Sequence, residues 1–378
     1  ISFGSLHRYL KKGLLRAHSS AIRPILTNAN KYCRLKYALN FVKPNFEISE
    51  MLNYVHLDEK WFYLTRQDQK YYLVPGESEP DRKCKSKRYI TKVMFVAAVA
   101  RPRYLEDTCE WWDGKIGLWP FTTLAAAQHS SANRPAGTLE TKTVNVTKDV
   151  YRTYLLEKVL PAIVRKWPGD TRDIILQHDN AKTHVTVSDK RLKQSFDTYK
   201  SAGCTFRLEP QPPNSPDFNV LDLGFFAALL SLQHREAARC IDELVDNVEN
   251  AFKEYPSDRL DCRFMTLQTC LLEAMKVHGD NTYKIPHLSK EKKQRRGMLG
   301  RNVCCSLELH ADAAGMLQMC DREAMDAACA AELTDLRGMD ELSRVLEEMT
   351  LGGDDYEDLA HALVEVGIDT IDLSSSDV

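Results

Sequence analysis

The spacing of apolar side chains predicts helices in the first 45 residues of the chain. In residues 5–14 apolar side chains recur at helical spacing after a possible N-cap, Ser5. Pro24 then breaks the pattern, and Thr27 or Asn28 can cap a second helix that runs to about residue 42. The pattern therefore predicts two short helices in succession.

From residue 51 the pattern changes to that of β-strands. Segments rich in aromatic and β-branched residues are separated by short polar stretches, as in an antiparallel meander. The expected strands are 54–64, 70–74 and 92–100. Residues 101–146 lack this pattern, and we expect an irregular insertion there.

Helical and strand patterns alternate after residue 146. The expected elements are a helix at 147–166, a strand at 173–178, a helix near 187–200, a strand at 206–209 and, after a proline-rich loop, a helix from about residue 219. Three strands followed by alternating helices and strands is the element order of a ribonuclease H-like domain. We therefore expect an α/β fold with a ribonuclease H-like mixed sheet and flanking helices.

The formal net charge of -2 hides a strong separation of charge along the chain. Residues 311–378 hold 18 Asp and Glu against 3 Lys and Arg, which leaves 48 basic and 35 acidic residues in 1–310. Residues 1–45 contain nine Lys and Arg and no acidic residue, which favours a polyanionic partner such as nucleic acid. A charge run of this kind can equally be a solvated surface.

The basic first segment suits the second half of a helix-turn-helix, whose recognition helix enters the major groove of DNA. The chain begins at Ile1, so we expect that an earlier part of the DNA-binding region is missing. Candidate DNA-binding side chains of this segment are His7, Arg8, Lys11, Lys12 and Arg16.

Composition excludes other classes of protein. No apolar run reaches the ~18 residues that a membrane span needs, and no signal peptide is visible, so we expect an intracellular protein without a membrane partner. The eleven cysteines include no C-x-x-C pair. We interpret them as reduced thiols, which form neither a disulfide framework nor a zinc finger.

Three aspartates lie at positions where a neutral or apolar residue would cost less folding free energy. Asp58 lies in the middle of the first predicted strand, where a lone buried carboxylate is costly unless it is paired or bound to a metal. Asp179 follows a strand at its C-terminal end, where α/β sheets place ligand sites. Asp222 lies in the first turn of the helix after the proline-rich loop. If the strands are neighbours, the three carboxylates converge.

Clustered carboxylates favour Mg²⁺ or Mn²⁺ over zinc, since hard cations prefer oxygen ligands. Two such ions ~3.5–4 Å apart can activate a water or a 3′ hydroxyl for in-line attack on a phosphodiester. The residues thus indicate a two-metal phosphodiester chemistry.

Each aspartate also has a purely structural interpretation. Asp222 could interact only with the helix dipole, and Asp179 could form an ordinary turn. Asp58 could pair with a lysine such as Lys92. Alternative site carboxylates that spacing does not exclude are Glu59, Asp173 and Asp217. Three histidines flank the site, and we expect them to form hydrogen bonds and not to bind metal; they are His56, His178 and His184.

Four strings around these aspartates resemble the catalytic domain of mariner-type DDE/D transposases, most closely their plant-type branch. They are HLDEKWFYL (56–64), KVMFVAAVARPR (92–103), QHDNAKTH (177–184) and QPPNSPDFNVLDLGFF (211–226). Matching pieces extend over roughly the first 300 residues. In that family the aspartates of the DEKW and HDNA strings, with the acidic residue five positions after the SPD aspartate, form the metal-binding triad. By this match the triad is Asp58, Asp179 and Asp222, and Asp217 is the supporting SPD aspartate.

The resemblance implies a DNA transposase that uses two Mg²⁺ or Mn²⁺ ions. It would excise a DNA element at its terminal inverted repeats by hydrolysis, insert it at TA dinucleotides, and act as a homodimer on double-stranded DNA. The hairpin 65–90 takes the place of the family's clamp loop. Its candidate DNA-binding side chains are Lys83, Lys85, Lys87 and Arg88.

The expected domains are a partial helix-turn-helix with linker at 1–50, the catalytic domain at 51–300, and an acidic, partly helical or disordered tail at 301–378. The tail has no counterpart in the family, and its partner is unknown. A basic run, KKQRR (292–296), could serve as a nuclear localisation patch, so we expect the protein in the nucleus.

Two other functions remain open at this point. The chain could be an inactive or domesticated transposase-derived protein that binds DNA without cutting it, which salt-dependent binding without nicking would favour. It could also be a ribonuclease H-like nuclease that acts on RNA or hybrids, which a panel of substrates would identify.

Overall fold

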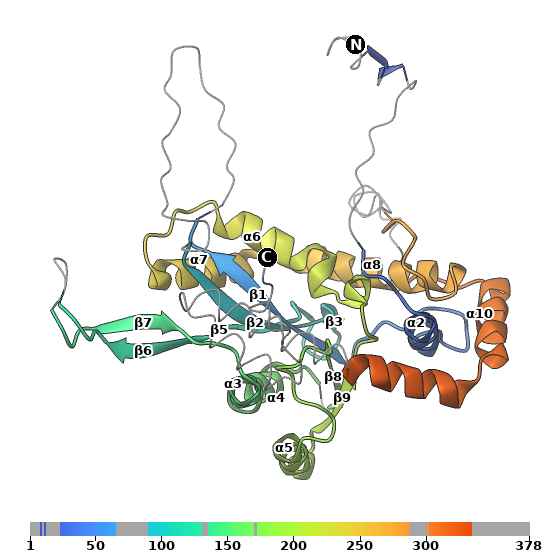
Figure 1. Ribbon diagram of the computed structural model, residues 1–378, viewed down its shortest axis with the longest axis horizontal. Helices are drawn as coiled ribbons and strands as arrows, with labels where there is room; N and C mark the ends of the chain where they lie inside the picture. Colours follow the sequence, from blue (N-terminus) through green and yellow to red (C-terminus); the bar gives the residue numbers. More distant parts are fainter. Residues whose placement is uncertain are drawn as a thin grey trace, which may run out of the picture.

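A five-stranded mixed sheet forms the centre of the structure, a computed structural model that describes residues 8–9, 11–12, 23–65, 90–130, 135–169, 172–286, 300 and 302–334 (Figure 1). The strands lie in the order β5-β2-β1-β8-β9. Their bounds are β1 Tyr54–Tyr63, β2 Lys92–Ala100, β5 Lys115–Pro120, β8 Asp173–His178 and β9 Thr205–Pro210.

The first three strands of the sheet are antiparallel and the last two are parallel. β1 pairs with β2 from Val55 opposite Ala100 to Tyr63 opposite Lys92, and β2 pairs with β5. β8 runs parallel to both β1 and β9. This arrangement, an antiparallel meander extended by two parallel strands, is that of a ribonuclease H-like sheet, and it confirms the expected fold class.

Helices cover both faces of the sheet (Figure 1). On one face lie α3 (Lys148–Tyr154), a π-helical turn (Leu155–Val159), α4 (Leu160–Lys166) and α5 (Lys190–Ser201). On the other lie α6 (Phe226–Gln233), α7 (Ile241–Glu254) and α8 (Ser257–Lys276).

Strand β2 shows why two hydrophobic cores form. Successive side chains of a strand point to opposite faces. Phe95 and Ala97 therefore join the core beneath α6, α7 and α8, while Val96 and Ala98 join the core beneath α3, α4 and α5. A strand that is buried on both faces needs apolar side chains at successive positions, which explains the continuous apolar run in the sequence.

The helix predicted at 147–166 is present and begins at the predicted cap. The Thr147 side chain accepts a hydrogen bond from the Val150 amide, which satisfies a free donor of the first turn. Its π-helical turn precedes Pro161, whose nitrogen cannot donate a hydrogen bond. The strand predicted at 173–178 has the bounds of β8.

The prediction of an irregular insertion at 101–146 is wrong. This stretch forms β3 (Arg103–Leu105), β4 (Glu110–Trp112), β5, β6 (Thr122–Ala126) and β7 (Leu139–Thr143). β5 is the third strand of the meander, whereas the strand expected at 70–74 lies outside the described residues.

Short strands explain this error. β3 and β4 have three residues each, too few to show a period of two, and both form a separate hairpin. β5 is entered through Gly114, whose φ is +70°; a Cβ there would lie 2.1 Å from the Ala100 carbonyl oxygen. The turn is thus fixed by backbone packing that the hydrophobic pattern does not reveal.

The N-terminal helix α2 (Asn28–Asn40) is part of the same core as the sheet. Thr27 caps it, as one of the two predicted alternatives, by accepting from the Asn30 amide. Leu35 and Ala38 are buried in the cluster that contains α6, α7 and α8, and α2 contacts α8 and α10 (Leu307–Met319). Ala313 of α10 is buried in this cluster too, so the beginning of the predicted tail packs on the domain.

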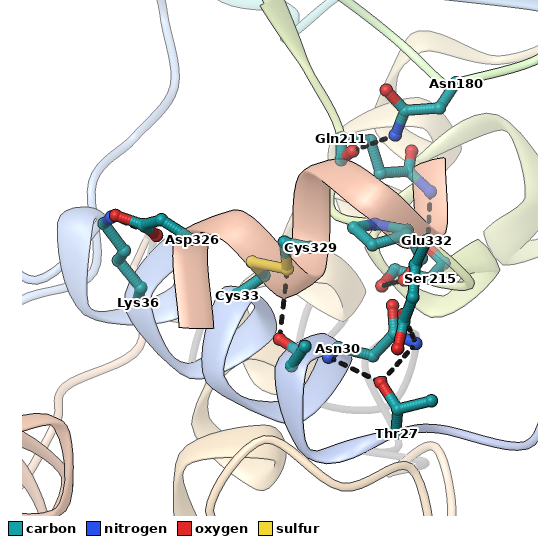
Figure 2. The surroundings of a disulfide bond; sticks show 12 residues. Thr27, Asn30, Cys33, Lys36, Asn180, Gln211, Ser215, Asp326, Cys329 and Glu332 are labelled. Carbon is teal, nitrogen blue, oxygen red and sulfur yellow. Dashed lines mark hydrogen bonds and ion pairs between the residues drawn. A yellow bond between two sulfur atoms is a disulfide. The ribbon is translucent and has the colours of Figure 1, made fainter. Parts of the chain in front are cut away.

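A disulfide joins α2 to the helix at 322–334 (Figure 2). It links Cys33 to Cys329, which lie 296 positions apart in the sequence. The two helices also exchange polar contacts on either side of the disulfide. These are Asn30 with Glu332 and Lys36 with Asp326. The prediction of reduced thiols is therefore wrong for this pair, because only tertiary packing brings the two cysteines together.

The helices of the described residues are all too short or too polar to cross a membrane. The acidic stretch 335–378, residues 66–89 with the predicted hairpin, and the basic run 292–296 lie outside the described residues.

Candidate active site

The register of β1 and β8 brings two of the predicted aspartates to the same level of the sheet. These parallel strands pair Val55 with Leu176 and His56 with Gln177. Two residues further along each chain are Asp58 and Asp179. Asp58 is 7% exposed and points to the face covered by α6–α8, because its strand neighbours Val55 and Leu57 belong to the opposite core.

Asp222 reaches Asp58 through the amide of Asn219. Asn219 Nδ2 donates to Asp58 Oδ2 at 2.6 Å and, at the longer distance of 3.4 Å, to Asp222 Oδ2. The Asn219 Oδ1 atom accepts from the Leu221 amide at 3.0 Å, which fixes the orientation of the side chain. Asn219 is 4% exposed. One buried amide therefore bridges two of the three carboxyl groups.

The chain is irregular around Asp222. It lies in a π-helical turn, Leu221–Phe225, in which Leu223 and Gly224 leave helical geometry. Gly224 has a φ of 106°, a conformation that favours glycine. Irregular helical turns of this type frequently occur at functional sites.

Lys60 supplies positive charge at the open side of this group. It follows Asp58 by two positions on β1 and so shares its face. Its Nζ lies 3.7 Å from Asp222 Oδ1 and 5.6 Å from the centroid of the Phe226 ring. Because Lys60 is 40% exposed, this ion pair is partly screened by water.

Burial and mutual repulsion make two of the carboxyl groups hard to ionise. Burial raises the pKa of Asp58 well above its usual value, and the charges of Asp222, Glu59 and Asp179 raise it further. Burial also raises the pKa of Asp222, an effect that Lys60 counteracts and Asp179 reinforces. The arrangement thus disfavours the charged forms of both carboxyl groups, and either a bound proton or a nearby cation would offset the repulsion.

Asp179 is held by His184. Burial alone would raise the pKa of Asp179, but the hydrogen bond and charge of His184 lower it to about 2. His184 Nδ1 lies 2.8 Å from Asp179 Oδ1, and its Nε2 lies 2.7 Å from Glu59 Oε2. Carboxylate oxygens only accept, so both ring nitrogens donate and the imidazole carries a positive charge.

The His184 ring is fixed by stacking as well. Tyr151 and His178 lie with their ring centroids 4.3 Å and 4.7 Å from that of His184. The Tyr151 hydroxyl also lies 3.2 Å from His178 Nδ1. The expectation that the histidines near the site form hydrogen bonds is confirmed for His178 and His184. His56 packs against Phe264 instead, and its Nε2 has no hydrogen-bond partner among the described residues.

The alternative carboxylates fall in different places. The Glu59 side chain points to the opposite face of β1 and contacts His184, while its backbone amide donates to Asp58. Asp173 lies at the other end of β8, where it pairs with Arg207. Asp217 forms an ion pair with Arg34 of α2. The possible pairing of Asp58 with Lys92 is wrong, since Lys92 lies over the Trp61 ring and Asp58 contacts Asn219.

The candidate DNA-binding residues lie mostly outside the described part of the chain. Arg8, Lys11 and Lys12 are described and exposed. The others, for which the prediction stays as it was, are His7, Arg16, Lys83, Lys85, Lys87 and Arg88.

Sequence reasoning missed two residues that touch the carboxyl groups. Asn219 gave no signal beyond its place three residues before Asp222, in a string of loop residues. Lys60 could have been found, because it lies on the same strand face as Asp58 at a spacing of two.

The donor set of the three carboxylates fits Mg²⁺ or Mn²⁺ in chemistry, since all the oxygens are hard ligands. The described residues nevertheless contain no group of three His, Cys, Asp or Glu side chains arranged to hold a metal ion. Asn219 lies between Asp58 and Asp222, and His184 binds Asp179.

Solved structures with a similar course of the backbone are complexes and domains of Mos1. The mariner Mos1 paired end complex with Mg has a TM-score of 0.49 and 17% identity, covering 74% of this chain and 71% of that chain. A pre-cleavage Mos1 transpososome has a TM-score of 0.48 and 17% identity, covering 75% and 72%. The catalytic domain of Mos1 mariner transposase has a TM-score of 0.44 and 15% identity, covering 70% and 100%.

No protein-family model matches the chain. No curated protein matches it either. The chemistry of the site therefore rests on this chain's own side chains.

Proposed function

We propose that the chain is a DNA transposase of mariner type. It hydrolyses phosphodiester bonds at the ends of a DNA element and transfers the freed 3′ hydroxyl to target DNA. The observation that carries the proposal is that Asp58 and Asp179 end at the same level of the mixed sheet, and that Asn219 links Asp58 to Asp222. The charges of Asp222 and Asp179 raise the pKa of the buried Asp58 further. The motifs shared with plant-type mariner transposases support it.

Asp58, Asp179 and Asp222 would hold two Mg²⁺ or Mn²⁺ ions in this proposal. When bound, such ions lower the pKa of water or of a 3′ hydroxyl and stabilise the leaving oxygen in an in-line displacement. The raised pKa values of Asp58 and Asp222 support cation binding at this place, because a divalent charge offsets the repulsion between the carboxylates.

The other side chains of the site orient these carboxylates. The Asn219 side-chain amide donates to one oxygen of Asp58 and one of Asp222 and so orients both carboxyl groups. Its own Oδ1 accepts from the Leu221 amide, which fixes the Asn219 side chain. The positively charged His184 holds Asp179 ionised and ready to bind a cation. Such outer contacts fix the orientation of metal ligands and tune their basicity.

The partner in this proposal is double-stranded DNA, bound at terminal inverted repeats by a homodimer that inserts at TA dinucleotides. The excess of basic residues in 1–310 supports a polyanionic partner. Nuclear localisation belongs to the same proposal, since the DNA substrate is there.

A cleavage assay tests the proposal. The full chain is incubated with duplex DNA that carries the ends of its element, in Mg²⁺ or Mn²⁺. We expect nicks at the element ends in the wild type, and a loss of at least about 10³-fold in Asp58→Ala, Asp179→Ala and Asp222→Ala. Asp173→Ala is the matched control, since Asp173 lies at the opposite end of β8, and it should cleave like the wild type.

The proposal is refuted if all three variants cleave as the wild type does. Salt-dependent DNA binding without nicking in either metal would instead identify a DNA-binding protein derived from a transposase. Cleavage of RNA or hybrids alone would identify a nuclease of the same fold.

A further inference from the structure

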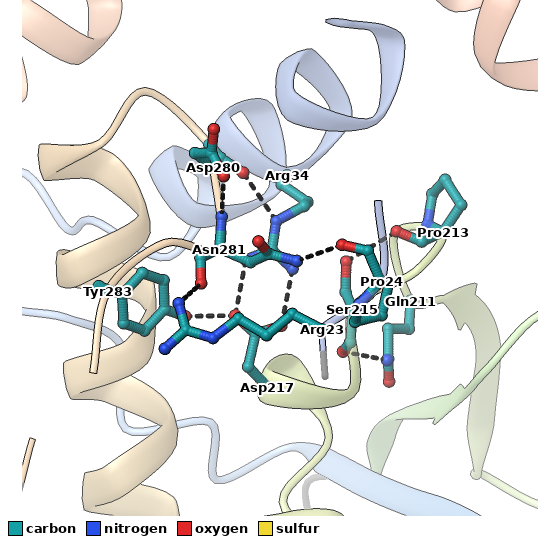
Figure 3. Close-up of polar contacts among 11 residues, drawn as sticks. Arg23, Pro24, Arg34, Gln211, Pro213, Ser215, Asp217, Asp280, Asn281 and Tyr283 are labelled. Carbon is teal, nitrogen blue, oxygen red and sulfur yellow. Dashed lines mark hydrogen bonds and ion pairs between the residues drawn. The ribbon is translucent and has the colours of Figure 1, made fainter. Parts of the chain in front are cut away.

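Arg34 of α2 is a fully buried arginine in a dense polar network (Figure 3). Its Nη1 and Nη2 donate to the two carboxylate oxygens of Asp217 at 2.7 and 2.6 Å, and its Nε donates to the Gly279 carbonyl at 2.8 Å. The Tyr283 hydroxyl also donates to Asp217. The guanidinium lies 4.3 Å from the centroid of the Phe218 ring. Each nitrogen of the guanidinium thus has a hydrogen-bond partner, and an aromatic ring lies against the group.

The network ends one residue before the candidate active site. Asp217 and Phe218 belong to the 3₁₀ turn Pro216–Phe218, and the next residue is Asn219, which bridges Asp58 and Asp222. The same turn is held from the sheet, because Gln177 of β8 donates to the Phe218 carbonyl at 3.3 Å. The turn that presents Asn219 is therefore held between α2 and β8.

Helix α2 also packs closely against residues 279–280, which follow α8 in the chain. A Cβ on Gly279 would lie 2.0 Å from the Lys31 carbonyl oxygen, so the two backbones touch. Lys31 also pairs with Asp280 at 2.6 Å. The place of α2 relative to residues 279–280 is consequently fixed by backbone packing as well as by charge, and Arg34 reaches Asp217 from this fixed helix.

We propose that Arg34 is a positioning residue of the active site, which holds the 216–218 turn through Asp217 so that Asn219 and Asp222 face Asp58. This inference rests on the proposed function, because it assigns the network to the metal-binding carboxylates. It also makes the N-terminal helix α2 a structural part of the catalytic apparatus.

Only arginine supplies the required geometry. Its planar fork matches both oxygens of Asp217, stacks on Phe218, and still has Nε free for Gly279. Lysine would keep the charge but could not make these contacts at once. Removing one partner of such a buried pair leaves the other uncompensated, which is costly.

The experiment measures Mn²⁺ binding to the full chain by electron paramagnetic resonance, together with hydrogen exchange of residues 214–226. We expect Mn²⁺ affinity to fall roughly 10- to 100-fold in Arg34→Met, the range found when the outer contacts of metal ligands are removed. The Mn²⁺ affinity of Arg34→Lys should lie between those of the wild type and Arg34→Met. In Arg34→Met, the amides of 214–226 should exchange faster than in the wild type.

Two further variants keep the test informative if Arg34→Met does not fold. Tyr283→Phe removes only the hydroxyl that contacts Asp217, and we expect a several-fold loss of Mn²⁺ affinity with faster exchange confined to 214–226. The apolar double variant Arg34→Met with Asp217→Leu should recover stability without recovering affinity, since buried ion pairs can be replaced by apolar side chains. Lys36→Met is the matched control: it removes a charge from the same helix, at a pair with Asp326 that is far more exposed.

The outcomes separate this inference from the proposed function. Wild-type Mn²⁺ binding that Asp58→Asn leaves unchanged would overturn the proposed function, and this inference with it. Wild-type binding that Asp58→Asn abolishes, but that Arg34→Met and Tyr283→Phe leave unchanged, would overturn the positioning role alone. Recovery of both stability and affinity in the apolar double variant would likewise reduce the network to a structural role.

Discussion

Asp58 is the residue at which stability and the proposed chemistry conflict most directly. It is buried, it faces other carboxyl groups, and its main compensating contacts are the Asn219 amide and the backbone amide of Glu59. Neither contact carries a full positive charge. A buried carboxylate placed in this way costs folding free energy and is retained where a cation is to be bound.

Asp58→Asn should therefore stabilise the protein while abolishing cleavage. The pKa of Asp58 is higher in the folded protein than in the unfolded chain, so the native protein binds this proton more tightly. The free energy of unfolding therefore falls as the pH rises from the unfolded pKa to the folded pKa. At pH 7 we expect the variant to gain roughly 1 kcal/mol in the free energy of unfolding without metal, measured by urea denaturation. A loss of stability in the variant would contradict this account of the site.

His56 should make the protein sensitive to acid. Complete burial lowers its pKa to about 3, whereas in the unfolded chain it titrates near its ordinary value of 6.5. Below pH 6.5 the unfolded state takes up a proton that the native state does not, so stability falls as pH falls. As the pH falls from 7 to 5, His56 should lower the free energy of unfolding by about 2 kcal/mol.

Urea denaturation at both pH values tests this prediction. The variant His56→Phe keeps a ring against Phe264. Between pH 7 and 5 its free energy of unfolding should fall by about 2 kcal/mol less than that of the wild type. His129→Phe, at an exposed position, is the matched control for the exchange of a histidine for phenylalanine. Equal pH dependence in wild type and His56→Phe would show that His56 takes up its proton in the folded protein.

Among the elements, α2 packs more closely on the domain than its sequence indicates. The sequence predicts it as half of a helix-turn-helix, and the structure packs it into the core beside α8 and α10. Two of its basic side chains, Lys31 and Arg34, are already paired with acidic groups of the domain. Recognition of DNA by the basic segment stays a prediction.

Reduction of the Cys33–Cys329 disulfide should weaken the attachment of the helix at 322–334. The crosslink closes a loop of nearly the whole described chain, and disulfides typically contribute about 2–4 kcal/mol. We expect dithiothreitol to lower the melting temperature of the wild type and to expose residues 322–334 to limited proteolysis. Cys33→Ser should behave like the reduced wild type and respond no further to the reagent.

A control with another cysteine completes this experiment. Cys240 is free and exposed, so Cys240→Ser should retain the response of the wild type to dithiothreitol. A wild type whose melting temperature and proteolysis pattern do not change on reduction would show that the disulfide contributes nothing to the docking of this helix.

At the scale of the whole molecule, the separation of charge should govern DNA binding. Residues 335–378 carry 13 acidic and 2 basic residues, attached to a body with an excess of basic residues. Negative charge tethered to a protein repels DNA over about a Debye length, ~10 Å at 0.1 M salt. The stretch should therefore compete with DNA without any specific contact.

Truncation after residue 334 should raise the affinity for nonspecific duplex DNA by several-fold at ~50 mM salt, and the difference should shrink at higher salt. Fluorescence anisotropy over a salt series measures it. A full-length chain in which the 13 acidic residues are changed to Asn or Gln is the control, and it should bind like the truncated chain. Weak binding by this neutralised chain would point to the bulk of the stretch and not to its charge.

The sequence by itself determined the elements whose signals are local. The run at 173–178 predicts β8 because a strand buried on both faces must be apolar throughout, and Thr147 predicts a helix start because its hydroxyl satisfies a free amide. Asp58 and Asp179 also have a local signal, since a carboxylate beside a buried strand is costly in free energy wherever the strand lies. Asp222 has a different local signal, its place in the first turn of the helix after the proline-rich loop. Their identification as metal ligands stays a prediction.

Tertiary structure alone decided which distant groups meet. No local pattern announces that β5 completes the meander through a glycine turn, or that Cys33 reaches Cys329. The same is true of Arg34, which looks like any surface arginine until its helix packs against the 216–218 turn. Such contacts depend on how whole elements are placed relative to one another. Many weak packing interactions along the elements set this placement together, so it cannot be inferred from the few residues that form one contact.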